Sequence, residues 1–131
     1  MNVLESKTIL PASLAAFFAE PGYCESTFFE SRKNSRLRIR CKAAISIEAS
    51  PPSIPRSERQ FIVYVKDISK RGIGIVSHIQ IFPAEELLIC FQHREVRATA
   101  VRCRRIGDFC WECGAQITSF KNLEEDNEYN T

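Results

Sequence analysis

Residues 60–77 read QFIVYVKDISKRGIGIVS, and this stretch decides the fold. Two apolar runs rich in β-branched residues, FIVYVK and IGIVS, flank a polar break of six residues, DISKRG at 67–72. Apolar runs of this length, bounded by Asp, Ser and Gly, are typical of two strands joined by a tight turn. We therefore predict strands over 60–66 and 73–77, and the flanking sequence shows whether they belong to a larger sheet.

A third strand is predicted upstream of this pair, over RLRIRCK at 36–42. Its residues alternate strictly, with Leu37, Ile39 and Cys41 on one side and basic residues on the other. A period of two indicates a strand with one dry face. We expect the strand to continue through AAISIEA, with a change of register at Ala43-Ala44.

Three more strands are predicted downstream, over LLICFQ, REVRATAVRCRRI and CWECGAQITSF. Pro83 excludes a central strand from the segment IQIFPAEE that precedes them. The loop SPPSIPRSER at 50–59, which precedes the strand predicted over 60–66, is rich in Pro and Ser. Six short strands with no helix between them predict a mainly β fold, an antiparallel barrel or sandwich.

The N-terminal stretch ILPASLAAFFA is as apolar as a signal-peptide core, but its flank has no clear positive charge. Leu10, Leu14, Phe17 and Phe18 fall on one helical face, and Pro11 suits a first turn. We therefore expect a short amphipathic helix over 11–20. No run approaches the roughly 20 apolar residues of a membrane span, so we expect no membrane insertion.

Six cysteines occur in the 131 residues. Cys41, Cys90 and Cys103 lie inside predicted strands, where single cysteines usually behave as small buried hydrophobes. Cys110 and Cys113 form the one close pair, whereas a structural zinc site needs about four ligands. We predict six free thiols and no bound metal, as expected of a reduced cytoplasmic protein.

Composition describes an ordinary globular domain, with 44% hydrophobic and 26% charged residues and a net charge of +2. Basic residues crowd between Arg32 and Lys42, and acidic residues gather in EEDNE near the C-terminus. Both histidines are isolated, no Gly-rich loop opens a helix, and no paired carboxylates stand on a recognisable scaffold. We therefore expect neither an enzyme nor a cofactor.

Two polar segments remain as a candidate site. The first, RKNSR, holds Arg32 and Arg36, whose planar guanidinium groups match phosphate and stack on flat rings. The second holds Asp67, whose carboxylate complements the donors on the guanine edge, together with Ser69 and Gly72. Taken alone, an Arg-rich flank is usually a solvated face, and D-x-S-x-x-G is usually a turn.

The order and setting of the two segments make the chain resemble the PilZ family, bacterial receptor modules for cyclic di-GMP. That family carries R-x-x-x-R before its first strand, matched by Arg32 and Arg36, and D/N-x-S-x-x-G after its second, matched by Asp67, Ser69 and Gly72. The stretch WECGAQITSF also resembles the closing strand of the family. The resemblance covers roughly residues 32–120 and fills all the signature positions.

The arginine motif has a second register, from Arg36 to Arg40. We prefer Arg32 and Arg36, because in the family the second arginine directly precedes the alternating strand, as Leu37 and Ile39 follow Arg36 here.

The resemblance implies a six-stranded antiparallel barrel with its ligand on the outer surface. Arg32 and Arg36 would grip phosphate and stack on guanine, and Asp67 and Ser69 would read a guanine edge. The chain would divide into an N-terminal helix and connector (1–31), the barrel (32–120) and an acidic tail (121–131). Ser31 stands where family members that bind a self-stacked ligand pair tend to carry an arginine, so we expect one ligand per chain.

The function that the resemblance implies is that of a cytoplasmic receptor that changes shape on binding cyclic di-GMP and docks on another protein. An alternative is a PilZ-like scaffold or interaction protein that does not bind nucleotide. A third interpretation is a small barrel that binds RNA or single-stranded DNA, which needs exposed stacking aromatics in a basic groove. The aromatic residues fall mostly in apolar strand positions, so we expect no nucleic-acid partner.

Overall fold

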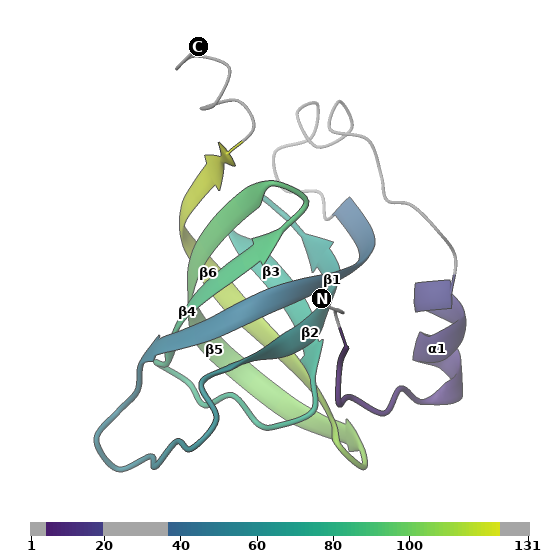
Figure 1. Ribbon diagram of the computed structural model, residues 1–131, viewed down its shortest axis with the longest axis horizontal. Coiled ribbons are helices and arrows are strands. Elements are labelled where there is room, and N and C mark those ends of the chain that lie inside the picture. Colours follow the sequence, from purple (N-terminus) through teal and green to yellow (C-terminus); the bar gives the residue numbers. More distant parts are fainter. Residues whose placement is uncertain (1–4, 20–36, 124–131) are drawn as a thin grey trace.

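A computed structural model of the chain describes residues 5–19 and 37–123, with the backbone alone described for residues 37–39. Its elements are one helix and six strands (Figure 1): α1 (Ala12–Ala19), β1 (Leu37–Ala49), β2 (Gln60–Ile68), β3 (Gly72–Ser77), β4 (Glu86–Phe91), β5 (Arg94–Gly107) and β6 (Cys110–Asn122).

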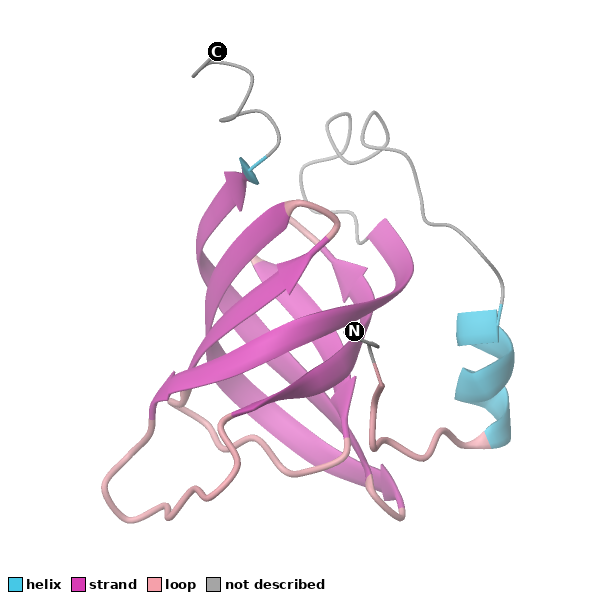
Figure 2. Ribbon diagram, viewed as in Figure 1, coloured by secondary structure: helices cyan, strands magenta, loops and turns pink. Residues whose placement is uncertain are grey.

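The strands form a closed antiparallel barrel in the order β1-β2-β3-β6-β5-β4, and β4 pairs with β1 to complete it. Closure leaves no strand with an unpaired edge. The predicted mainly β barrel with a short N-terminal helix is therefore confirmed (Figure 2). The strands β2 and β3 extend into the polar break, so the turn between them is only Ser69 to Arg71.

Alternate residues of the strands point inward and fill the barrel. The core consists mainly of aliphatic side chains, among them Ile45, Val63, Val65, Ile73, Ile75, Leu87, Ile89, Val96 and Ala98. In β1 the inward row runs through Ala43, Ile45 and Ile47, while Ala44 is exposed. The change of register expected at Ala43-Ala44 was therefore wrong, because Ala44 simply takes its turn on the outer face. The irregularities of β1 lie on either side of this row.

The helix α1 lies against the outside of the barrel beside β1 and β2. It begins after Pro11, whose carbonyl accepts the N–H of Ala15 at 2.8 Å. The ring of Phe18 lies 4.7 Å from that of Tyr64, and the Arg40 guanidinium lies over Phe17. The predicted apolar face of the helix is thus partly covered by the barrel. No helix in the described ranges is long and apolar enough to cross a membrane.

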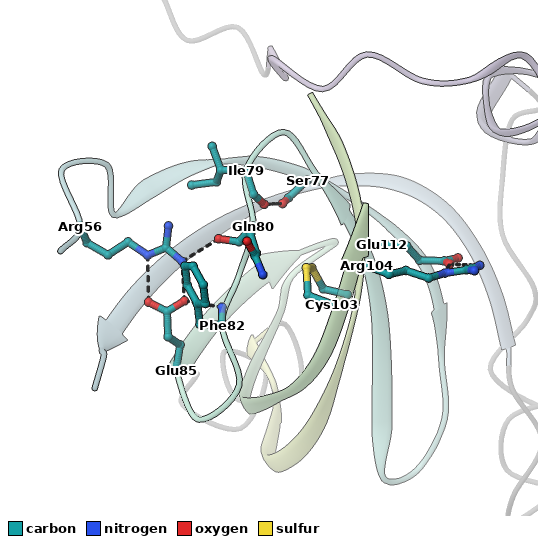
Figure 3. Close-up of a disulfide and its surroundings, with 10 residues drawn as sticks. Arg56, Ser77, Ile79, Gln80, Phe82, Glu85, Cys103, Arg104 and Glu112 are labelled. Carbon is teal, nitrogen blue, oxygen red and sulfur yellow. Dashed lines mark hydrogen bonds and ion pairs between the residues drawn. A yellow bond between two sulfur atoms is a disulfide. The ribbon is translucent and has the colours of Figure 1, made fainter. Parts of the chain in front are cut away.

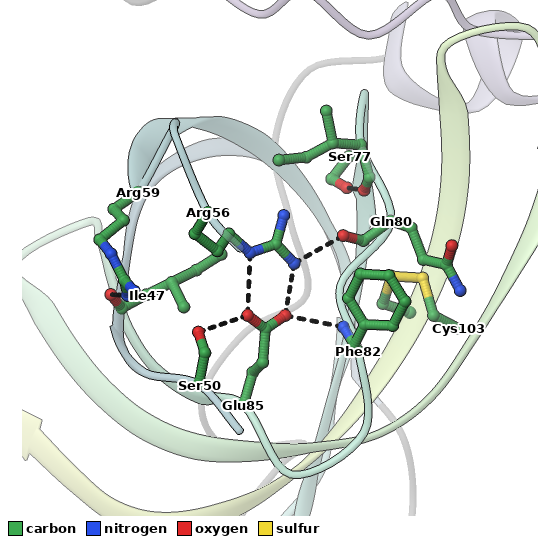
Figure 4. A network of polar contacts seen from close by, with 11 residues as sticks. Ile47, Ser50, Arg56, Arg59, Ser77, Gln80, Phe82, Glu85 and Cys103 are labelled. Atoms are coloured by element: carbon green, nitrogen blue, oxygen red, sulfur yellow. Dashed lines mark hydrogen bonds and ion pairs between the residues drawn. A yellow bond between two sulfur atoms is a disulfide. The ribbon is translucent and has the colours of Figure 1, made fainter. Parts of the chain in front are cut away.

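The loops at one end of the barrel are joined by a buried ion pair between Arg56 and Glu85 (Figure 4). Glu85 is fully buried and accepts hydrogen bonds from Arg56 Nε at 2.8 Å, Ser50 Oγ at 2.6 Å and the Phe82 N–H at 2.8 Å. Arg56 also donates to the Gln80 carbonyl at 2.7 Å. Burial alone raises the pKa of Glu85, but these hydrogen bonds outweigh it and leave the pKa below its ordinary value.

A disulfide joins Cys103 of β5 to Cys113 of β6, so the prediction of six free thiols was wrong (Figure 3). The two residues are direct cross-strand partners, with their Cα atoms 4.1 Å apart. In contrast, Cys110 and Cys113 lie three residues apart on one strand, an offset that directs side chains to opposite faces. Cys110 is a free thiol. The one close pair in the sequence, Cys110 and Cys113, is thus not the pair that is joined.

Candidate ligand site on the outer face of the barrel

One row of residues crosses the outer face of four strands. Asp67 of β2 pairs with Gly74 of β3, Gly74 pairs with Gly114 of β6, and Gly114 pairs with Arg102 of β5. The two glycines leave the middle of the row without side chains. A carboxylate and a guanidinium group therefore stand on either side of a low floor.

Irregularities in two strands direct these charged side chains outward. The β2–β3 register shifts between Val65 and Asp67, and the β5–β6 register shifts between Ala100 and Arg102. Val65 and Ala100 belong to the core, so strict alternation would have turned Asp67 and Arg102 inward as well. An extra residue in each strand reverses the side on which the following residue lies.

The carboxylate of Asp67 lies directly over Gly74. A Cβ atom at Gly74 would lie 2.7 Å from Asp67 Oδ1, a separation that forces one of them to move. A Cβ at Gly114 would meet Arg102 Nε at 3.7 Å, an ordinary contact. Gly74 thus provides the space that the Asp67 carboxylate occupies.

A hollow of about 380 Å³ opens over this row. Its wall includes a second carboxylate, Glu112, which accepts hydrogen bonds from Arg104 Nε at 3.0 Å and Nη2 at 2.8 Å (Figure 3). Lys66 forms an ion pair with the other oxygen of Glu112. The hydrogen bonds from Lys66 and, secondly, from Arg104 hold the pKa of Glu112 below its ordinary value. Glu112 therefore stays ionised and engaged with its two cations.

The turn after β2 is held by the side chain of Ser69. The Gly72 N–H donates to Ser69 Oγ at 3.2 Å, and the Ser69 N–H donates to the Gly72 carbonyl at 2.7 Å. The Arg71 carbonyl accepts the N–H of Ile117 at 2.8 Å, which fastens the turn to β6. Ser69 in this structure therefore closes the turn, as the ordinary interpretation of D-x-S-x-x-G expects.

A second hollow, of about 290 Å³, adjoins the first beside this turn. Ser69, Arg71 and Gly72 line it, together with Gln116 of β6. Arg102 and Gly114 line both hollows, so the two share part of their walls at the middle of the row.

The structure thus brings together Asp67, Ser69 and Gly72 of the predicted site on one outer face. Arg32 and Arg36 lie outside the described residues. Sequence reasoning did not identify Gly74 and Arg102. The bulges that turn this row outward appear only in the strand pairing, so the period-two pattern of the sequence did not mark either residue.

Metal binding has no visible basis in the described ranges, which contain no cluster of three or more His, Cys, Asp or Glu residues that could hold an ion. The chemistry of the site is instead that of hydrogen bonding and charge. It offers a carboxylate acceptor that lies over Gly74 and guanidinium donors, of which that of Arg102 lies beside Gly114.

These features define a closed β-barrel with a charged, ligand-sized groove on its outer face. No protein-family model matches the chain, and neither a curated protein nor a solved structure does. The function has therefore to be inferred from the site and its sequence motifs.

Proposed function

We propose that the protein is a receptor for cyclic di-GMP of the PilZ type. The observation that carries this proposal is the outward carboxylate of Asp67, held over Gly74 at the edge of a hollow. The N1–H and the exocyclic amino group of guanine are adjacent donors, and one carboxylate accepts both. Asp67 therefore presents the group that a guanine edge requires, on a surface that a base can reach.

The pairing of β1 with β2 supports a role for the arginine motif. Arg38 is the backbone partner of Asp67, and Arg36 stands two residues before it in the chain. The motif of Arg32 and Arg36 therefore joins the barrel at the strand that neighbours Asp67. In the proposal these arginines bind the phosphates and stack on guanine while Asp67 binds the base from the barrel side.

Binding would serve signalling rather than catalysis. A ligand held by both the arginine motif and the barrel would change the conformation of the chain that precedes β1, and a partner protein would respond to that change. Helix α1 is part of the chain that precedes β1, and its Phe18 packs on Tyr64 of the barrel. We place this activity in the bacterial cytoplasm, where cyclic di-GMP is a second messenger.

The alternative is a PilZ-like interaction protein that does not bind nucleotide. One observation favours it, because Ser69 Oγ accepts the Gly72 N–H and so has a purely structural use. A turn maintained for this reason would keep its Ser and Gly without any ligand. That use concerns the turn alone, whereas the carboxylate of Asp67 lies over Gly74 at the edge of the first hollow.

Calorimetry with cyclic di-GMP distinguishes these functions, with GMP as the control ligand. We expect one ligand per chain and a micromolar Kd, which corresponds to about −8 kcal/mol. Asp67→Ala should abolish the heat of binding while the circular dichroism of the barrel is unchanged. A flat trace for folded wild-type protein at concentrations well above that Kd would favour the scaffold instead.

A further inference from the structure

We propose that Arg71 and Arg102 form a second, barrel-borne anion site that binds a phosphate group in the hollow beside the turn. The inference rests on the proposed function for the identity of its ligand, but the site itself follows from the charges on the groove. The arginines of R-x-x-x-R are not part of it.

The two hollows differ in charge. The first has mixed charge, with the carboxylates of Asp67 and Glu112 beside three cations, Lys66, Arg102 and Arg104. The second is lined by Arg71 and Arg102 and has no acidic residue among its described lining. The carboxylate of Asp67 in the first hollow therefore suits the donors of a guanine edge, and the second hollow, whose charged lining is cationic alone, suits an anion.

Both guanidinium groups are available to a ligand. Arg71 and Arg102 are exposed, and the guanidinium group of neither forms a hydrogen bond or an ion pair with any residue in the described ranges. Arg104 and Lys66 differ in this respect, because both are engaged with Glu112. Two cations on one hollow repel each other, and an anion between them removes that repulsion.

Strand pairing sets the distance between the backbones of Arg71 and Arg102. The Arg71 carbonyl is bonded to the Ile117 N–H of β6, and Arg102 is the partner of Gly114 on the other side of β6. Their backbones are thus separated across β6 by two strand spacings and along β6 by the three residues from Gly114 to Ile117, roughly 14 Å at ordinary strand dimensions. Two arginine side chains can reach one phosphate across that span, and each can donate two hydrogen bonds to it.

The shared wall gives the ligand a direction. Because Arg102 and Gly114 line both hollows, one molecule can lie across them with its base against Asp67 and a phosphodiester between the arginines. The barrel alone would then bind both the base and a phosphate of the nucleotide.

Calorimetry on three single variants tests the anion site. Arg71→Ala and Arg102→Ala should each weaken cyclic di-GMP binding about 10- to 100-fold, as expected for lost hydrogen bonds between charged groups. Lys70→Ala is the matched control, since Lys70 is exposed on the same turn, carries the same charge and lines neither hollow. Lys70→Ala should change the Kd less than threefold, roughly the effect of a distant surface charge. Unchanged binding in both arginine variants, or an equal loss in Lys70→Ala, would overturn the site while leaving the receptor function intact.

A second measurement keeps the inference independent of the receptor function. If cyclic di-GMP does not bind the wild-type protein, that function fails, and the Arg Nε–Hε resonances are then followed by NMR during titration with inorganic phosphate. Shifts of the Arg71 and Arg102 signals that saturate together would support the anion site by itself. The absence of such shifts would overturn it.

Discussion

Gly74 and Asp67 are opposite each other on β3 and β2, and the missing side chain of Gly74 leaves the space over β3 that the Asp67 carboxylate occupies. The glycine is therefore part of the candidate site although it offers no functional group. Its contribution can be measured separately from that of the carboxylate.

Gly74→Ala should impair ligand binding with little effect on the barrel. The new Cβ would lie 2.7 Å from Asp67 Oδ1, and the side chain of Asp67 can move more readily than the backbone of β3. We expect a loss of cyclic di-GMP affinity of about 10- to 100-fold, as for a lost charged hydrogen bond. The free energy of unfolding should change by less than about 1 kcal/mol, a shift in Tm of a few degrees.

Gly107→Ala is the matched control for this substitution. The new Cβ would meet Pro11 Cγ at 3.6 Å, an ordinary contact, and Gly107 ends β5 outside the lining of both hollows. Calorimetry and thermal unfolding of both variants separate the site from the strand. If Gly74→Ala binds as tightly as Gly107→Ala, the position of the Asp67 carboxylate does not matter to the ligand.

Strand alternation predicts the barrel well but not the direction of the charged side chains. The rows Phe61, Val63, Val65 and Val96, Ala98, Ala100 were readable from the sequence because one dry face repeats every second residue. The bulges that follow these rows depend on how the strands pair in space. A period-two count therefore places Asp67 and Arg102 inside, and pairing moves both outside.

The disulfide was missed for a related reason. Cys103 and Cys113 are ten residues apart, and nothing in that spacing marks a pair until the hairpin register of β5 and β6 is known. Local spacing drew attention to Cys110 and Cys113 instead. Residues three apart can approach each other in a helix or a loop, but on a strand they point to opposite faces. Contacts between strands are set by register, and register is the part of a sheet that a single sequence specifies least directly.

Thiol titration of denatured protein should find two fewer free thiols before reduction than after it. The expected difference comes from Cys103 and Cys113, and the double variant Cys103→Ser/Cys113→Ser should remove it. Disulfides that persist in the bacterial cytoplasm are usually redox-sensing, so the same titration on freshly lysed cells bears on where the protein acts. Equal thiol counts with and without reductant would show that these cysteines are not joined in solution.

The β4–β5 hairpin is predicted to tolerate, and to favour, glycine at its tip. Its two-residue turn places Gln92 and His93 at φ angles of 49° and 60°, the left-handed region that side chains disfavour. Turns of this kind prefer Asn-Gly. Gln92→Asn/His93→Gly should therefore stabilise the protein by about 0.5–2 kcal/mol in urea unfolding.

A glycine placed in a turn without positive φ provides the comparison. Lys70 lies in the turn between β2 and β3 and is not among the residues with positive φ. Lys70→Gly should lower stability by roughly 0.5–1 kcal/mol, the backbone entropy cost of glycine. Destabilisation of both variants would mean that the strained tip is held by contacts that glycine cannot replace.

The last prediction concerns the buried carboxylate of Glu85. Replacing it by Gln leaves the Arg56 guanidinium charged and largely buried, since 8% of its side chain is exposed. Removal of one partner from a buried pair costs about 3–5 kcal/mol, so Glu85→Gln should be strongly destabilised at pH 7. Glu86→Gln is the matched control, because Glu86 is the exposed neighbour and its carboxylate has no hydrogen-bond or ion-pair partner in the described ranges.

Because the folded-state pKa of Glu85 lies below its ordinary 4.5, its ionisation contributes stability that is complete above about pH 4.5. That contribution is lost as the pH falls through the lowered folded-state pKa. The stability difference between wild type and Glu85→Gln, measured by urea unfolding, should therefore be constant from pH 7 to 5 and shrink below that range. A difference that stays the same down to pH 3, or one no larger than that of Glu86→Gln at pH 7, would contradict a stabilising charge at this position.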